Sequence, residues 1–199
     1  MKKNKNKLFN MIAPLYNLFF NFQLKYYTKI LYGAKNVIDN SKYHSILDIG
    51  CGTGALCYVL NREGYKVTGI DAAKKMISIA EKNLYGKGID LVHVNALEGI
   101  PFNDNSFDIT IASYVLHGMK KEERKILVAE MSRVTKHRVI IHDYNGNRAF
   151  HTDIVEWLEG GDYFNFIKNV RSEMEEEFKT IQIINFKARA AWYVCTPYD

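Results

Sequence analysis

The sequence predicts an α/β fold: a mostly parallel, seven-stranded sheet with helices on both faces and an antiparallel hairpin at its C-terminal end. Three observations carry this prediction. Short apolar runs alternate with helical patterns over residues 45–143, and a glycine-rich turn, residues 50–54, follows the first of these runs. Two β-rich runs near the C-terminus are separated by only a few residues. A parallel pair needs a crossover of a dozen or more residues, so these two runs pair antiparallel.

The expected elements follow from the apolar spacing. The strands are Ser45–Ile49, Val67–Asp71, Asp90–Val94, Asp108–Ser113, Arg138–Asp143, Thr180–Phe186 and Ala191–Thr196. The helices are one that begins at Ala55, then Ala73–Leu84, Lys121–Val134 and Tyr163–Phe178. We expect residues 41–199 to form one compact domain, preceded by a helical lid over residues 1–40.

The N-terminal segment reads as an amphipathic helix. Its apolar face consists of Leu8, Ile12, Leu15, Phe19 and Phe22, and its polar face of Asn10, Asn17 and Asn21. The segment is too short and too interrupted for a membrane span or a signal peptide. Because its polar face carries asparagines rather than lysines, we expect the apolar face to dock on the protein's own core and not on a membrane.

Composition narrows the class of protein further. The 199 residues are 47% hydrophobic, enough for a full core, and three cysteines without paired spacing predict a reduced, cytoplasmic protein. The net charge of +5 comes partly from a lysine-rich start, which is more typical of a solvated end than of an RNA-binding arm. We expect no nucleic-acid partner and no stable membrane insertion, and the sequence does not predict an oligomeric state.

The glycine-rich turn indicates a nucleotide-like cofactor. Gly50 and Gly52 follow a buried strand and open a helix, and Asp71 ends the next strand, where a carboxylate accepts both hydroxyl protons of a ribose. Gly50, Gly52 and Ala55 also fit the dinucleotide fingerprint. Asp48, at the loop entrance, repels a pyrophosphate and attracts an amino group, so the pattern favours S-adenosylmethionine over NAD.

With these residues in place, the chain resembles the class I methyltransferases, and within them the small-molecule branch that includes the ubiquinone and menaquinone C-methyltransferases. The segments that carry the resemblance are Phe9–Asn17, Asp71–Met76, Pro101–Asp108, Ser113–His117 and Glu130–Val134. The chain departs from the family pattern at Asn95, where the family has Asp. It also departs at Thr135–Arg138, which replaces a Lys-Pro-Gly-Gly turn and predicts a tighter turn without glycine.

The resemblance implies a Rossmann-like class I methyltransferase fold and a set of cofactor contacts. Asp48 faces the amino group, the glycines lie along the methionyl and ribose portions, and Asp71 takes the ribose hydroxyls. Tyr16 closes the site as a lid or simply packs its helix down. The expected cofactor-binding residues are Tyr16, Asp48, Gly50, Cys51, Gly52, Asp71, Ala72, Met76, Asn95, Ala96, Leu97 and Ser113.

Two residues are candidates for chemistry. His117 follows the fourth strand and Asp143 ends the fifth, where open α/β sheets bind ligands, and either is a candidate general base. Alignment alone also accelerates methyl transfer, in which case His117 is only a loop histidine. We expect no metal, because Ser113 stands where a metal site would need a further acid.

The predicted function is therefore methyl transfer from S-adenosylmethionine to an N, O or C nucleophile of a small molecule. Three alternatives remain at this stage. The acceptor is RNA or protein, the chain is a cofactor-binding scaffold without chemistry, or it is an NAD-dependent reductase, although it lacks a Tyr-x-x-x-Lys pair.

Overall fold

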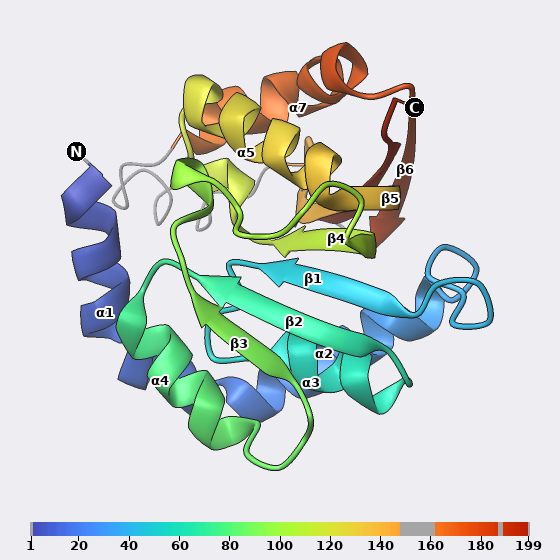
Figure 1. Ribbon diagram of the computed structural model, residues 1–199. Coiled ribbons are helices and arrows are strands. Elements are labelled where there is room, and N and C mark those ends of the chain that lie inside the picture. The colour runs from blue at the N-terminus through green and yellow to red at the C-terminus, as the bar shows by residue number, and fades with distance from the viewer. Residues whose placement is uncertain (1, 148–161, 187–188, 199) are drawn as a thin grey trace. The chain divides into compact units, whose positions relative to one another are not determined.

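Figure 1 shows the computed structural model, which describes residues 2–147, 162–186 and 189–198. The chain forms two compact units, Met1–Ile100 and Pro101–Asp199, and each is described by itself. The strands expected from the apolar runs are all present, with boundaries that differ by up to three residues. None of the helices in the described residues combines the length and apolar content needed to cross a membrane.

The first unit is a three-stranded parallel sheet with helices. Its elements are α1 (Lys2–Leu18), α2 (Phe20–Gly33), β1 (Ser45–Ile49), α3 (Ala55–Arg62), β2 (Lys66–Asp71), α4 (Lys74–Asn83), β3 (Asp90–His93) and the short 3-10 helix η1 (Ala96–Glu98). The strand order is β3-β2-β1. Because the chain moves in one direction along the sheet, right-handed crossovers put α3 and α4 on the same face. Helix α2 then packs on α3, and α1 packs on α4.

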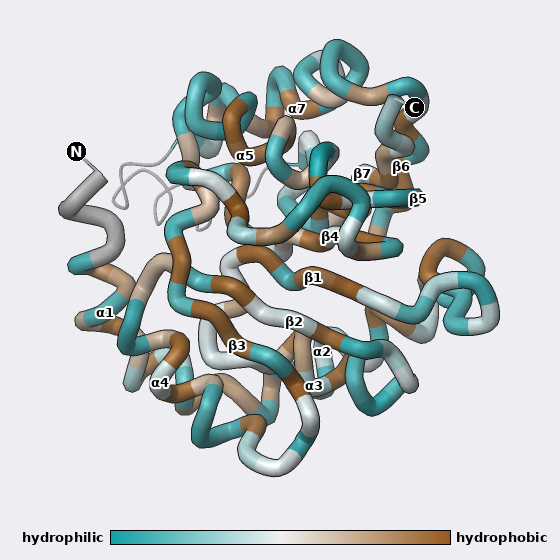
Figure 2. The backbone as a smooth tube through the Cα atoms, in the orientation of Figure 1, coloured by the Kyte–Doolittle hydropathy of each residue, from teal (hydrophilic) through white to brown (hydrophobic). Residues whose placement is uncertain are grey.

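Apolar side chains of the strands and of α3 form the core of this unit. Ile46, Leu47, Leu60 and Ile70 are at most 1% exposed. Figure 2 shows β1 as a hydrophobic stretch between more polar connections. A strand that is covered on both faces is a continuous apolar run in the sequence, and for this reason the boundaries of β1 could be predicted.

The N-terminal helix packs with the opposite face to the one expected. Ala13 is fully buried against Ala73 and Met76. On the same face, Asn10 Oδ1 accepts a hydrogen bond from the Lys75 backbone N–H at 2.8 Å, and Asn17 Oδ1 accepts one from Asn83 Nδ2 at 2.9 Å. The apolar face that we expected to dock is largely exposed: Leu8 36%, Leu15 55%, Phe19 54% and Phe22 69%. The prediction was wrong because the small Ala13 allows close approach while the flanking amides supply specific hydrogen bonds.

The second unit joins a parallel pair of strands to an antiparallel hairpin. Its elements are β4 (Phe107–Ser113), the 3-10 helix η2 (Leu116–Gly118), α5 (Lys121–Val134), β5 (Thr135–Tyr144), α7 (Tyr163–Glu177), β6 (Thr180–Phe186) and β7 (Ala190–Thr196). The strand order is β4-β5-β7-β6, with β4 and β5 parallel and β7 antiparallel to both of its neighbours. The predicted C-terminal hairpin, and with it the mostly parallel α/β class, is confirmed.

The turn expected at Thr135–Arg138 does not exist. Helix α5 ends at Val134, and β5 begins at the next residue. The Thr135 hydroxyl donates to the Met131 carbonyl at 2.5 Å and lies 2.8 Å from the Thr110 hydroxyl of β4. The side chain thus satisfies a carbonyl at the end of the helix, so no glycine is needed there.

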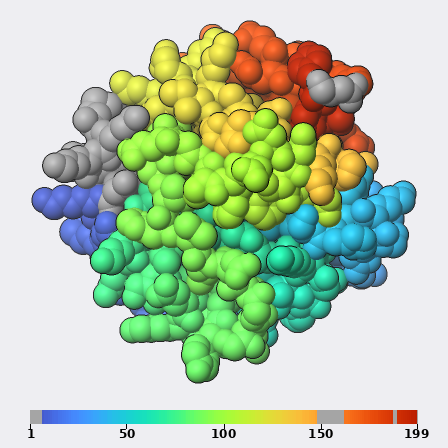
Figure 3. Space-filling model, viewed as in Figure 1, coloured from blue at the N-terminus to red at the C-terminus, as the bar shows by residue number. Residues whose placement is uncertain are grey.

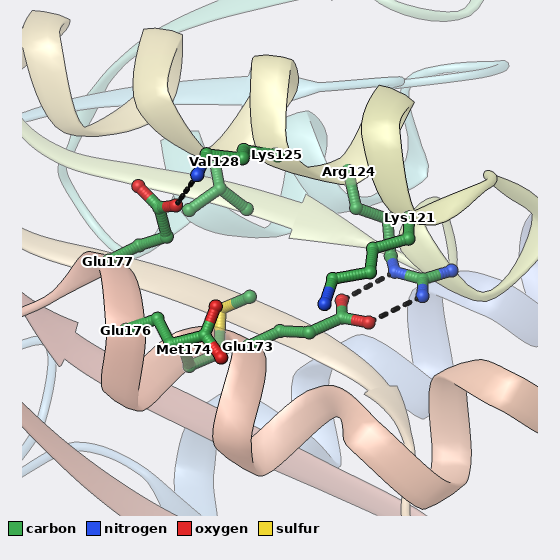
Figure 4. A pocket seen from close by; sticks show the side chains of 8 residues that line it. All are labelled: Lys121, Arg124, Lys125, Val128, Glu173, Met174, Glu176 and Glu177. Atoms are coloured by element: carbon green, nitrogen blue, oxygen red, sulfur yellow. Dashed lines mark hydrogen bonds and ion pairs between the residues drawn. The ribbon is translucent and has the colours of Figure 1, made fainter.

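A buried ion pair joins α5 to α7. The Arg124 guanidinium is 1% exposed and donates two hydrogen bonds of 2.7 Å to the Glu173 carboxylate. A third bond, of 2.9 Å, goes to Asp162. Figure 4 shows this pair in the wall of a pocket lined by Lys121, Arg124, Lys125, Val128, Glu173, Met174, Glu176 and Glu177. The acidic run on α7 therefore includes one structural residue, Glu173.

Candidate functional site

The loop between β1 and α3 exposes bare backbone. Gly50 and Gly52 have φ angles of +72° and +55°, a conformation that other residues rarely adopt. The N–H groups of Gly50 and Cys51 donate to the Ile70 carbonyl of β2 at 2.8 and 3.0 Å, which fixes the loop on the sheet. A Cβ added at Gly52 would meet nothing within 4 Å. The backbone at Gly52 therefore borders open space, as close contact with a ligand requires.

Asp71 connects the end of β2 to this loop. One of its carboxylate oxygens accepts the Gly52 N–H at 2.9 Å, and the other accepts the Ala73 N–H at 2.7 Å. Burial raises the pKa of Asp71, and these two hydrogen bonds counteract the shift. Both oxygens keep lone pairs for further donors. A fixed carboxylate beside open loop backbone is the arrangement that a ribose-bearing ligand needs, so these residues fit S-adenosylmethionine.

Asp48 lies beneath the loop. Its side chain is 1% exposed, and the Cys57 thiol donates to Asp48 Oδ2 at 3.1 Å. Burial raises the pKa of Asp48 to about 7, and the nearby charge of Asp71 acts in the same direction. A Cβ added at Gly69 would come within 3.0 Å of the sulfur atoms of Cys57 and Cys51, so only glycine fits there. Sequence reasoning did not find this acid–thiol contact, because Cys57 stands on the next helix without a motif.

Of the residues expected around an adenine, Met76 lies in the core and Asn95 lies at the start of a short helix. Met76 is 2% exposed and packs against Ala13 of α1, in the core. Asn95, by contrast, begins η1: its Oδ1 accepts the Leu97 N–H at 3.2 Å, and its Nδ2 donates to Glu98 at 2.8 Å. The amide thus positions the start of η1, a role that an aspartate at this point would also fill in part.

Tyr16 and Ser113 belong to different units. Tyr16 lies on α1 with 39% of its surface exposed. The Ser113 hydroxyl, at the end of β4, lies 3.0 Å from Nδ1 of His142 on β5. Burial lowers the pKa of His142 to about 4, so this imidazole stays neutral at pH 7.

The second unit brings the two candidate catalytic residues together. His117 Nδ1 lies 2.8 Å from Asp143 Oδ1, and the other carboxylate oxygen accepts the backbone N–H groups of Leu116 and His117 at 3.0 and 3.2 Å. The Tyr144 N–H donates to Oδ1 as well, at 2.8 Å. An ionised carboxylate only accepts, so Nδ1 of His117 carries the proton and Nε2 is the basic nitrogen. Asp143 is fully buried, whereas His117 is 9% exposed.

Aromatic rings surround this dyad. The ring of Tyr144 lies 4.9 Å from that of His117, and Tyr114 lies 5.3 Å from Tyr144 and 6.4 Å from His117. Tyr114 has a φ of +54°, an uncommon conformation for a bulky residue that its N–H supports by donating to the His142 carbonyl at 2.8 Å. Strained residues of this kind cluster at functional sites. Tyr114 belongs to the Ser113–His117 segment of the family resemblance, but nothing in that segment predicts its left-handed backbone conformation.

Comparisons with known proteins identify methyltransferases among the proteins similar to this chain. A family model described as "Methyltransferase domain" matches residues 47–141. An uncharacterized methyltransferase of Staphylococcus carnosus is 24% identical over 84% of this chain and 81% of its own length. The demethylmenaquinone methyltransferase of Thermotoga maritima is 28% identical over 69% of this chain, a match that spans only 59% of the relative.

A solved structure supports the fold. Magnesium protoporphyrin IX methyltransferase from Synechocystis PCC 6803, with bound S-adenosylhomocysteine, has a TM-score of 0.64 at 15% identity, over 88% of this chain and 83% of that one. The likeness extends to most of both chains. The expected Rossmann-like fold is thereby confirmed.

Proposed function

We infer that the chain is a class I S-adenosylmethionine-dependent methyltransferase and that it methylates a small molecule whose nucleophilic atom loses a proton to His117. The cofactor supplies a methyl group on a sulfonium, which is already activated for transfer. The protein must then hold the cofactor, align the acceptor and take up its proton. The residues of the two units divide these tasks.

Holding the cofactor falls to the first unit. We assign the ribose hydroxyls to Asp71, whose two carboxylate oxygens are held in place by the N–H groups of Gly52 and Ala73. The open backbone at Gly52 provides contact with the rest of the ligand. Asp48 contributes negative charge from below the loop rather than from its surface, because the side chain is buried.

Removing the proton falls to the second unit, and the His117–Asp143 hydrogen bond is the observation that carries the proposal. The bond fixes the tautomer with Nε2 basic, and the carboxylate stabilises the imidazolium that forms when Nε2 accepts the proton. His117 is the catalytic residue, and Asp143 is a positioning residue. The same pattern of a histidine oriented by a buried carboxylate activates nucleophiles in unrelated enzymes.

The surroundings of His117 favour a planar, apolar acceptor with an ionisable hydroxyl, thiol or amino group. The rings of Tyr114 and Tyr144 stand around the imidazole and offer edge-on and stacking contacts to such a molecule. The Thermotoga and Synechocystis proteins are named as methyltransferases of demethylmenaquinone and magnesium protoporphyrin IX, and both of these acceptors are small molecules. An RNA or protein acceptor has no comparable support.

The test compares turnover with cofactor affinity. A panel of small phenols, thiols and aromatic amines is screened for release of S-adenosylhomocysteine, and His117→Ala and Asp143→Asn are then assayed on the best acceptor. We expect kcat to fall roughly a hundredfold to ten-thousandfold for His117→Ala. Asp143→Asn should lower kcat as well, because the imidazolium that forms on His117 loses its carboxylate. The dissociation constant of S-adenosylhomocysteine should change little in either variant.

Two control variants frame this result. His137→Ala removes an exposed histidine at the opposite end of β5 and should leave kcat unchanged. Asp71→Ala should show the converse pattern, with cofactor affinity lost. Wild-type turnover in both His117→Ala and Asp143→Asn would show that the enzyme works by alignment alone. Tight cofactor binding without turnover of any acceptor would favour a scaffold.

We further propose that residues 1–40 act as a lid for the cofactor site. Tyr16 lies on α1, the first helix of this lid. Asn83 supports this proposal, because its Nδ2 donates both to Asn17 of α1 and to the Thr53 carbonyl of the glycine-rich loop, at 2.9 and 3.0 Å. A change in the loop on cofactor binding therefore reaches α1 through one side chain.

The three cysteines are free and buried thiols, which supports the proposed cytoplasmic location.

A further inference from the structure

The outer face of the N-terminal helices carries a regular apolar stripe. Its members on α1 recur at alternating intervals of three and four residues, the spacing of one helical face, and the last member stands on α2, beyond the break at Phe19. They are Leu8 (36% exposed), Met11 (71%), Leu15 (55%), Leu18 (78%) and Phe22 (69%). The opposite face holds α4 through Asn10, Ala13 and Asn17. Figure 3 shows α1, in blue, at the surface. Exposed apolar residues that gather on one face in this way mark an interaction surface.

The same interval continues from the apolar stripe into basic residues. Lys25 and Lys29 follow Phe22 at steps of three and four, and both side chains are exposed. Tyr32, three residues further, is 75% exposed, and Lys35 Nζ stands 5.1 Å from the centre of its ring. Long basic side chains and tyrosine rings next to apolar ones are characteristic of helices that lie in a membrane interface.

The charge of the segment is of one sign. Residues 1–38 contain seven lysines, at positions 2, 3, 5, 7, 25, 29 and 35, and no aspartate or glutamate. The whole chain has a net charge of only +5, so the remainder is net negative. A second copy of the chain would set this charge against an identical one, whereas an anionic lipid surface complements it.

We propose that α1 and α2 dock on the surface of an anionic lipid bilayer, with the stripe from Leu8 to Phe22 in the interface and the lysines at the headgroups. The inference is independent of the proposed reaction, because it uses only the face of α1 that points away from α4. The sequence alone predicts no membrane contact for this segment, because the polar face of the helix carries asparagines rather than lysines. Asn10 and Asn17 are engaged with α4, and Lys7, Lys25 and Lys29 lie on the same helices as the stripe.

The experiment measures binding to vesicles of phosphatidylcholine with and without phosphatidylglycerol, by flotation. The wild-type chain should bind vesicles that contain phosphatidylglycerol and not those of phosphatidylcholine alone. Met11→Glu/Leu18→Glu should weaken binding at least tenfold. Lys25→Gln/Lys29→Gln should weaken it roughly thirtyfold, about fivefold for each lysine.

Each double variant has a matched control elsewhere on the surface. Tyr85→Glu/Tyr198→Glu adds the same charge at two exposed rings, 89% and 62% accessible, and should bind vesicles like the wild type. Lys66→Gln/Lys82→Gln removes two exposed lysines outside residues 1–38 and should have little effect. Circular dichroism and S-adenosylhomocysteine binding establish that all four variants are folded.

Three results would overturn the proposal. The first is no binding of the wild type to either kind of vesicle. The second is equal loss in the variants and their matched controls, which would indicate nonspecific adsorption. The third is a dimer in sedimentation equilibrium that Met11→Glu/Leu18→Glu dissociates while vesicle binding is unchanged, because the stripe would then be covered by a second copy.

Discussion

At the scale of single residues, Asp48 shows how a motif residue acquires a second role. The loop motif predicts an acid at this position for its charge, yet the structure buries it beside the Cys57 thiol. Burial raises its pKa from an ordinary value of 3.8 to about 7. Near neutral pH this carboxyl therefore exchanges its proton, and the charge under the cofactor loop depends on pH.

The raised pKa predicts a pH-dependent stability. Between pH 4 and 7 the folded chain holds the Asp48 proton and the unfolded chain has lost it, so the contribution of Asp48 to the free energy of unfolding falls as the pH rises through this window. His142, whose pKa is lowered to about 4, contributes in the opposite direction, so the effect of Asp48 is the difference between the wild type and Asp48→Asn. Below this window and above it, the contribution of Asp48 to the free energy of unfolding does not change with pH. The slope is at most about 1.4 kcal/mol per pH unit. Urea unfolding of the wild type and of Asp48→Asn at pH 4.5 and at pH 7.5 (chosen at roughly the two ends of the window) isolates the Asp48 contribution.

Asp48→Asn should remove this contribution and gain stability relative to the wild type at the higher pH. Asp90→Asn changes an exposed acid at the start of β3 and should keep the wild-type dependence. Parallel curves for the wild type and Asp48→Asn would show that Asp48 does not titrate in this window.

At the scale of elements, buried polar pairs decide which faces meet. Helix α7 carries four glutamates in a short run, and only Glu173 is buried, where it receives both bonds from Arg124 of α5. In the same way, two asparagines and not the apolar stripe select the face that α1 presents to α4. Apolar spacing reports that a helix has two faces, but hydrogen bonds specify which one docks.

This pairing predicts a large asymmetry among arginine substitutions. Arg124→Met leaves the Glu173 carboxylate buried and uncompensated, and should cost roughly 3–5 kcal/mol of unfolding free energy. Arg171→Met, on the exposed surface of α7, removes a pair with Glu175 and should cost less than about 1 kcal/mol. Guanidinium unfolding measures both.

The double variant Arg124→Met/Glu173→Met tests the cause. It removes the unpaired charge and should recover most of the loss, because replacing a buried ion pair by apolar residues is often neutral. If Arg124→Met alone were as stable as the wild type, the pair would not hold α7 to α5.

At the scale of the whole molecule, the N-terminal segment links cofactor, loop and surface. Through Asn83, α1 is connected to the Thr53 carbonyl of the glycine-rich loop. We therefore predict that S-adenosylhomocysteine slows hydrogen exchange of the amides in α1 in the absence of any lipid. The measurement is hydrogen–deuterium exchange by mass spectrometry.

An Asn83→Ala variant provides the control for this lid. It should still bind the cofactor, since Asn83 has no assigned contact with it, but the protection of α1 should be smaller. Exchange in α1 that does not respond to the cofactor, or that responds only to vesicles, would contradict the lid and leave the lipid surface as the sole function of the segment.

The sequence by itself determined the elements and the class of chemistry. A strand that is covered on both faces, such as β1, is a continuous apolar run in the sequence. The elements β1, α5 and β6 begin and end at the residues predicted. The glycines and Asp71 were recognisable because their roles are set by local backbone geometry. The same locality made the C-terminal hairpin predictable, since its short connection permits only one pairing.

Only the tertiary structure decided what depends on contacts between distant residues. The 2.8 Å bond from His117 to Asp143 joins residues 26 apart in the sequence, and no spacing rule foretells it. Three other features also depend on residues far apart in the sequence. They are the contact of buried Asp48 with the Cys57 thiol, the left-handed backbone conformation of Tyr114, and the choice of the face of α1 that packs inward. Periodicity specifies the faces of a helix, whereas the choice among faces is made by shape and hydrogen bonding with partners far along the chain.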